Sequence, residues 1–349
     1  MKKTKINING ILGITAVFLA FVCVVSTLSF IFAGEKYVPA MLDIPENEGK
    51  KSGYYTFLIA GTDAVSNSTD VLMLASLDVD GEAVSVLQIP RDTYIDREVA
   101  GYKTVSRINA VYAAEYNKAI GEGISKTDAK KRAMEALRAL LEEAFCIDID
   151  EYVLVDISAF RDVVDAVGGV DFDVPYDMNY SDPYQNLYID LKAGYQHLDG
   201  AGAEQLIRFR STPTADMGRI KVRGDFLKAM ISQVKEKLTF KAVYSIIKDV
   251  LPKVTTSAGL LDTLKYARCV YGAKTENINI KTMTAGAVAL PGGGWSAAVY
   301  LNKLAAKRDI EKYINKSKGE IDIEEFDKKR LFCDDSSDSA VLYYEREDL

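Results

Sequence analysis

Histidine and cysteine are scarce in this sequence. His197 is the single histidine, and the chain has four cysteines and neither a GxSxG nor a Walker A motif. This scarcity argues against histidine-based metal sites, Ser-His-Asp triads and Cys-His catalytic pairs. His197 lies in Gly194-Tyr-Gln-His-Leu-Asp-Gly200, a turn-like stretch, where we expect a structural role.

The cysteines show no paired spacing. Cys23 lies in a long apolar run, and Cys146, Cys269 and Cys333 lie far apart in the rest of the chain. Three cysteines cannot all pair within one chain, so we expect mostly buried apolar residues with room for one disulfide.

A broad excess of positive charge is also missing. The formal net charge is −7. Nucleic acid is therefore not expected as a partner, because phosphate backbones require a basic surface. A local group of arginines remains compatible with this composition.

Charged residues are absent from Ile6 to Gly34, and this segment is long enough to span a membrane. Three lysines precede it within residues 1–5, so the positive-inside rule places residues 1–5 in the cytoplasm. We expect a single-pass (type II) protein of the cell membrane with an extracytoplasmic domain. The alternative is a signal peptide cleaved near Ala33-Gly34, but cleavable apolar segments are usually about 7–15 residues long.

The rest of the sequence predicts a linker at 35–53, a domain at 54–314 and a charged, partly disordered tail at 315–349. Strand and helix patterns alternate, which favours a three-layer α/β domain. Asp80-Gly81 predicts a hairpin, and we expect Thr127 and Ser158 to cap helices. The predicted strands are 54–60, 71–77, 84–89, 152–156 and 170–174, and the predicted helices are 108–120, 127–145, 159–167, 201–209 and 220–238.

Arginines gather late in the predicted domain. Arg208 and Arg210 would share one face of an extended segment, and Arg219 and Arg223 would share one face of a helix. The planar donors of arginine suit phosphate oxygens, so this group indicates a phosphate or pyrophosphate site. The alternative is solvated surface arginines paired with carboxylates.

Other polar residues follow or precede the predicted strands, where α/β sheets place their sites. Asp63 follows the first strand, Asp70 precedes the second, and Arg91-Asp92 follows the third. Carboxylates are ligands that Mg²⁺ prefers, and such an ion assists phosphoryl transfer. The alternative for Asp63 and Asp70 is ordinary turn and cap chemistry.

Several short motifs in order resemble the LytR-CpsA-Psr family of cell-wall glycopolymer ligases. The likeness runs from about residue 54 to 230 and more loosely to about 314, and the N-terminal anchor also fits. Its motifs are Phe57-Leu-Ile-Ala-Gly-Thr-Asp63, Ser68-Thr-Asp70, Ile89-Pro-Arg-Asp92, Arg107-Ile-Asn-Ala110, Gly168-Gly-Val170, Gly194-Tyr-Gln-His-Leu-Asp-Gly200, Arg208-Phe-Arg210 and Asp216-Met-Gly-Arg219.

The resemblance implies a three-layer α/β/α domain with a mixed central sheet. It also implies a phosphotransferase that moves a glycopolymer, such as teichoic acid or capsule, from polyprenyl pyrophosphate to peptidoglycan. A muramic acid 6-hydroxyl would attack the sugar-side phosphorus, and polyprenyl phosphate would leave. The lipid would lie in an apolar tunnel between sheet and helices.

The same resemblance implies a role for each matching residue. Asp63 and Asp70 would hold Mg²⁺ or Mn²⁺. Arg91, Arg208, Arg210, Arg219 and Arg223 would bind the pyrophosphate, and the catalytic residues would be Arg91, Asp92 and Asp216. The two aspartates would orient arginines or assist proton transfer.

The sequence departs from the family pattern at two places. Ala64 follows Asp63 directly, where the family usually continues with Ser and Arg. Val222 and Arg223 stand where the family usually has Arg and Gln. The second hypothesis is therefore an anchored protein that binds polyprenyl phosphate or a wall polymer without catalysis.

Overall fold

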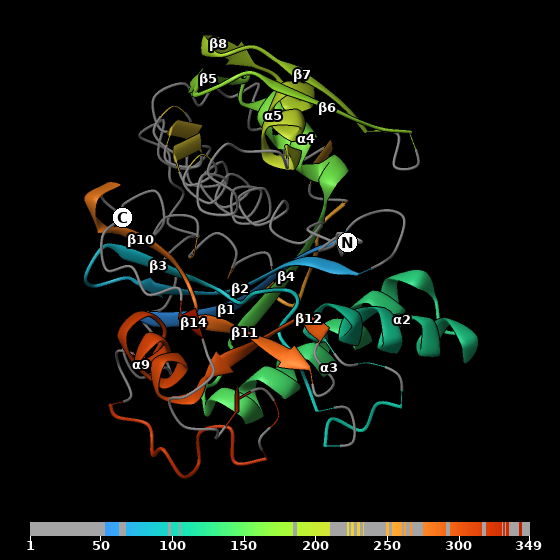
Figure 1. Ribbon diagram of the computed structural model, residues 1–349, viewed down its shortest axis with the longest axis vertical. Helices are drawn as coiled ribbons and strands as arrows, with labels where there is room; N and C mark the ends of the chain where they lie inside the picture. The colour runs from blue at the N-terminus through green and yellow to red at the C-terminus, as the bar shows by residue number, and fades with distance from the viewer. Residues whose placement is uncertain are drawn as a thin grey trace, which may run out of the picture.

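A six-stranded sheet lies at the centre of the computed structural model (Figure 1). Its order is β10-β3-β2-β1-β4-β9; β1 pairs antiparallel with β2 and parallel with β4, so the sheet is mixed, as predicted. The structure describes residues 53–62, 68–96, 99–103, 105, 107–183, 187–209, 222, 225–226, 229–230, 233, 249–250, 253–259, 262, 266, 275–290, 294–315, 319–329, 331, 333–334 and 342–343.

The central sheet combines a local meander with distant strands. The first three strands are consecutive in the chain, whereas β4, β9 and β10 join after long connections. The predicted hairpin at Asp80-Gly81 is confirmed, and the Asp78 carboxylate accepts a hydrogen bond from Gly81 N. The strands are β1 (Tyr54–Thr62), β2 (Thr69–Asp78), β3 (Ala83–Gln88), β4 (Glu151–Asp156), β9 (Thr255–Thr256) and β10 (Ile278–Thr282).

Both faces of the sheet are buried. The buried side chains form two hydrophobic cores, one on each face of the sheet, which we call the upper core and the lower core after their places in Figure 1. Along β1, Phe57 and Ile59 pack in the upper core, and Leu58 and Ala60 pack in the lower core. This is the two-residue period of a strand covered on both sides, and each fully buried Leu or Ile stabilises the fold by about 1.5–3 kcal/mol.

Helices cover the lower face of the sheet (Figure 1). On α3, Ala133, Leu137 and Leu141 form an apolar stripe in the lower core, the spacing expected of an amphipathic helix. Ser125, and not Thr127, is the N-cap of α3, because its hydroxyl accepts from Asp128 N. The helices on this face are η2 (Ile108–Ala110), α2 (Val111–Gly121), α3 (Lys126–Phe145) and α9 (Lys303–Tyr313). A short helix, η6 (Thr275–Asn277), directly precedes β10.

Among the elements that the structure describes from end to end, helices α4 and α5 and the strand pairs β5-β8 and β6-β7 lie over the upper face (Figure 1). Asp156, and not Ser158, caps the first helix, because Asp156 is extended and accepts from Ala159 N. His197 lies in a strand and not in a turn, with Nδ1 2.7 Å from Asp171 Oδ1. The elements are α4 (Ile157–Ala166), α5 (Gly200–Arg208), β5 (Val170–Val174), β6 (Met178–Asp182), β7 (Leu187–Leu191) and β8 (Gly194–Leu198).

A second sheet has the order β13-β12-β11-β14 and includes residues beyond 314. Ile321, Phe326 and Leu331 are buried in the lower core, so packed structure continues into the segment predicted as a tail. Cys146 is a free thiol. The strands are β11 (Ala285–Leu290), β12 (Gly294–Asn302), β13 (Cys333–Asp334) and β14 (Leu342–Tyr343).

Several predictions concern residues outside the described part of the chain. These include the membrane span at 6–34 and any disulfide through Cys269. No helix among the described residues combines the length and apolar character needed to cross a bilayer.

Candidate active site

Four strand ends meet at one edge of the central sheet. Thr62, the last residue of β1, pairs with Thr69 at the start of β2 and with Asp156 at the end of β4. Just past β3, Ile89 N donates to Leu72 O at 2.9 Å. The loop residues next to these strand ends are therefore close together, as expected for a site on an α/β sheet.

The two predicted metal ligands directly follow Thr62 and Thr69 in the sequence. Asp63 follows Thr62 in sequence but lies outside the described residues. Asp70 belongs to β2 and does not precede it. It is the extra residue of a β-bulge, because the neighbouring pairs are Gly61–Val71 and Thr62–Thr69. Bulges often redirect a side chain next to an active site, but the side chain of Asp70 is not described. Among the described residues, no three His, Cys, Asp or Glu side chains form a metal-binding group.

The predicted pair Arg91 and Asp92 forms a cluster with Arg107. Asp92 Oδ2 lies 3.3 Å from Arg91 Nε, and Asp92 Oδ1 lies 3.3 Å from Arg107 Nη1. The Arg91 side chain is only 5% exposed, whereas that of Arg107 is 35% exposed. We call these three residues the Asp92 cluster. Two guanidinium groups and one carboxylate carry a net positive charge, which favours an anion at this place.

Backbone hydrogen bonds hold the Asp92 cluster in place. Thr93 N and Oγ1 both donate to Pro90 O, which closes the turn after β3. Asn109 N donates to Arg91 O at 3.2 Å, and Thr69 Oγ1 donates to Asn109 O at 3.3 Å. The turn is thus fastened to η2 and β2, so the arginines are oriented before any ligand binds.

Arg208 belongs to a second cluster in the upper layer. Arg208 Nη1 lies 2.8 Å from Glu204 Oε1, and Arg161 Nη1 lies 3.3 Å from Glu204 Oε2. Glu204 is 13% exposed and Arg161 is 45% exposed. We call these residues the Glu204 cluster. Arg208 is the last residue of α5, so the predicted extended segment through Arg208 is wrong at its first residue, although Phe209 is extended.

The other predicted site residues are not described by the structure: Arg210, Asp216, Arg219 and Arg223. Val222 is helical and buried in the upper core with Phe226 and Met230, one helical face at four-residue spacing. The position where the family usually has arginine is therefore filled by an apolar side chain that packs into the core.

Sequence reasoning gave no role to Arg107, Arg161 or Glu204. The Arg107-Ile-Asn-Ala110 motif drew attention to Arg107. However, the hydrogen bond from Arg107 to Asp92 spans 15 positions and is visible only in the folded structure. The i,i+4 spacing of Glu204 and Arg208 on one predicted helix could have indicated that Glu204 pairs with Arg208.

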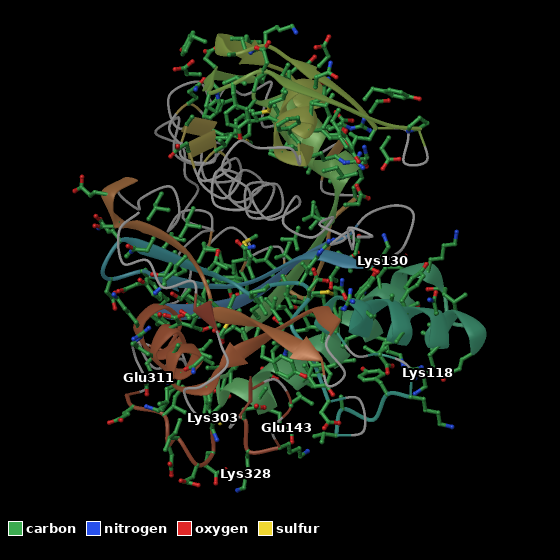
Figure 2. The ribbon with its side chains drawn as sticks, in the orientation of Figure 1. Lys118, Lys130, Glu143, Lys303, Glu311 and Lys328 are labelled. Atoms are coloured by element: carbon green, nitrogen blue, oxygen red, sulfur yellow. The ribbon has the colours of Figure 1, made fainter. Side chains whose placement is uncertain are left out.

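One ion pair far from the two clusters lies on the periphery. Lys328 pairs with Glu325, both are largely exposed, and Lys328 lies at the lower edge in Figure 2. It is a suitable control for charge removal far from the sheet edge.

The LytR_cpsA_psr family model matches residues 33–317. The chain belongs to the LytR_cpsA_psr family. Two relatives are TagV of Bacillus subtilis (strain 168), a polyisoprenyl-teichoic acid–peptidoglycan teichoic acid transferase, and LcpB of Corynebacterium glutamicum, a probable cell wall biosynthesis protein. TagV is 29% identical over 62% of this chain, and LcpB is 32% identical over 49% of it. The matches span 51% of TagV and 36% of LcpB, about half of each relative or less.

Solved structures confirm the mixed α/β fold of the family. The crystal structure of B. subtilis TagV is 24% identical, with a TM-score of 0.54 over 76% of this chain and 99% of that chain. TagT bound to LI-WTA is 19% identical, with a TM-score of 0.52 over 75% of this chain and 90% of that chain. These solved structures thus share the fold of this chain.

Proposed function

We propose that this protein transfers a glycopolymer from a polyprenyl pyrophosphate carrier to peptidoglycan by phosphoryl transfer, on the outer face of the cell membrane. The Asp92 cluster carries this proposal, because it presents two oriented arginines at the edge where the strand ends meet. The family and the transferase TagV support the substrate class. Teichoic acid and capsule are the candidate polymers.

The first step is binding of the pyrophosphate. Arg91 and Arg107 would donate hydrogen bonds to its oxygens, and Arg208, Arg210, Arg219 and Arg223 are the other proposed contacts. Asp92 is held by both arginines, so its role here is to orient them. Charge-assisted hydrogen bonds from arginine to phosphate are short and directional, so they can hold the reacting phosphorus in position.

The second step forms one P–O bond and breaks another. A peptidoglycan hydroxyl attacks the sugar-side phosphorus, the bond from that phosphorus to the oxygen bridging the two phosphates breaks, and polyprenyl phosphate leaves with the bond electrons. The hydroxyl proton passes to a carboxylate, for which Asp216 is the candidate. Arginine donors stabilise the charge that develops on the phosphoryl oxygens.

A divalent cation, Mg²⁺ or Mn²⁺, fits the carboxylates at this edge. Asp63 directly follows Thr62 in the sequence, and Asp70 directly follows Thr69, the cross-strand partner of Thr62, so each aspartate is one residue along the chain from the same strand pair. Carboxylate oxygens are the preferred ligands of such ions. When bound, the cation would supply charge neutralisation for the transferring group.

The second candidate function is binding without transfer. The observation that favours it is Val222, because a buried valine cannot donate to a phosphate. A coupling assay separates the two functions. The full chain in detergent is given a polyprenyl-pyrophosphate-linked saccharide, a peptidoglycan oligomer and Mg²⁺, and polyprenyl phosphate release and sugar coupling are followed.

The ligase hypothesis predicts metal-dependent coupling that is lost in Arg91→Ala and Asp70→Ala and retained in Lys328→Ala. Lipid binding without coupling, under conditions where TagV is active, would contradict it and support the binding function.

A further inference from the structure

Two tyrosines stand beside the Asp92 cluster. After the turn, burial alternates from Asp92 to Asp96: Thr93 and Ile95 are buried, whereas Asp92, Tyr94 and Asp96 are half-buried. Such alternation is typical of an extended segment with one inner and one outer face. Tyr94 therefore shares the outer face with Asp92.

The neighbours of Tyr94 bring it closer to the arginines. Tyr94 and Arg107 are partners in an antiparallel bridge, which places their Cβ atoms about 4.5–5.5 Å apart. On the other side, Tyr94 N donates to Val299 O at 2.8 Å, and Val299 N donates to Asp92 O at 2.9 Å. The Asp92 cluster is thus directly beside β12.

The next residue of β12, Tyr300, completes an aromatic pair. Its ring stacks on that of Tyr94, with centroids 4.8 Å apart and planes at 25°. Both side chains are half-buried, so the pair is fixed in position and still reaches the surface. Tyrosine combines a rigid apolar ring with a hydroxyl, and both can contact a sugar.

We propose that the Tyr94–Tyr300 pair is the subsite for the first sugar of the glycopolymer, the one attached to the pyrophosphate. This rests on the proposed function, because it requires the pyrophosphate at the Asp92 cluster. Two residues of extended strand separate Asp92 from Tyr94 by ~6.6 Å, about the length of one sugar ring. A sugar on the bound phosphate would reach the ring pair.

The subsite makes a prediction that a structural role alone does not. A ring pair that only fastens the loop to β12 would affect every ligand of the Asp92 cluster equally. A sugar subsite affects only ligands that carry a sugar. The deciding quantity is the ratio of two affinities, one for polyprenyl pyrophosphate and one for the same lipid bearing a single N-acetylhexosamine.

Both affinities are measured by titration calorimetry on the full chain in detergent. The wild type is expected to bind the sugar-bearing lipid more tightly, and Tyr300→Ala is expected to reduce this preference about three- to tenfold. Tyr94→Phe keeps the stacked rings and removes only a hydroxyl, so it is expected to reduce the preference less. Affinity for the sugar-free lipid should stay within about twofold in both variants. Tyr188→Ala is the control, because Tyr188 is 60% exposed on β7 in the upper layer.

Each alternative outcome refutes a specific statement. Equal affinity of the wild type for both lipids, or equal weakening of both in Tyr300→Ala, would overturn the subsite and leave the proposed function intact. Binding of neither lipid by the wild type would refute the proposed function and the subsite with it.

Discussion

The Asp92 cluster and the Glu204 cluster have the same composition, one carboxylate between two arginines, but they are built differently. Asp92 joins Arg91, in the turn after β3, to Arg107, the N-cap of η2, which lies 15 positions beyond Asp92 along the chain. Glu204 joins Arg208 on its own helix to Arg161 on α4. The first cluster depends mainly on tertiary contacts and the second partly on helical spacing.

Burial of the arginines differs in the same direction, whereas the two carboxylates are similarly enclosed, with Asp92 17% and Glu204 13% exposed. Arg91 is almost completely enclosed, whereas Arg161 is close to half exposed. Exposed ion pairs contribute little to stability, and loss of a partner from an enclosed charge costs much more. We infer that the Asp92 cluster is costly to disturb and that the Glu204 cluster tolerates change.

The largest expected effect is that of Asp92→Ala. It removes the carboxylate that Arg91 and Arg107 share, and we expect unfolding free energy to fall by about 1.5–3 kcal/mol. Urea unfolding measures this, with Asp92→Asn as the matched control that retains an acceptor oxygen. If Asp92→Ala lowers the unfolding free energy no more than Glu204→Ala does, the proposed difference between the two clusters is wrong.

A smaller effect is expected for Glu204→Ala. Its partners are partly or largely solvated, so we expect a loss of about 0.5–1 kcal/mol in the same urea experiment. In 1 M salt the Debye length is about 3 Å, so this loss should shrink while that of Asp92→Ala persists. Equal salt dependence of both variants would contradict the difference in burial.

The smallest effect on the free energy of unfolding is expected for a third ion pair, Lys307–Glu311 on α9. Like Glu204 and Arg208, these two residues are four positions apart on one helix. Burial alone would raise the pKa of Glu311, but the Lys307 ammonium and the Ile321 N–H lower it below the ordinary value of 4.5. A lowered folded-state pKa means that the stabilisation is complete above pH 4.5 and disappears as pH falls through the lowered pKa.

Glu311→Gln removes this titration. Urea unfolding between pH 2 and 7 should therefore show a gap between wild type and variant that closes in acid. A gap that is constant with pH would mean that packing, and not charge, accounts for the contribution of Glu311.

The sequence predicted the parts of the fold that depend on local periodicity. The five predicted strands and the turn at Asp80-Gly81 were confirmed, because strongly apolar runs with a turn signal have few alternatives. Helix caps were less certain, since Ser125 and Thr127, or Asp156 and Ser158, are all suitable residue types two positions apart. Only the backbone angles and the accepted N–H decide between them.

Within the candidate site, the sequence predicted the neighbouring pair Arg91 and Asp92 but not the arrangement around it. Arg91 and Asp92 were expected together, whereas Arg107 joins them through η2, which no spacing rule relates to β3. The bulge at Asp70 also depends on pairing between β1 and β2. Contacts of this kind arise from strand register, which a single sequence does not specify.

The most direct test of the Asp92 cluster as the pyrophosphate site is a binding measurement on Arg107→Ala. Arg107 is 35% exposed, so its removal should leave the fold intact, and Lys328→Ala is the matched loss of one positive charge elsewhere. Titration calorimetry with a short-chain polyprenyl pyrophosphate should show affinity at least about tenfold weaker for Arg107→Ala and unchanged for Lys328→Ala. Unchanged affinity in Arg107→Ala, or equal weakening in both variants, would contradict a pyrophosphate site at the Asp92 cluster.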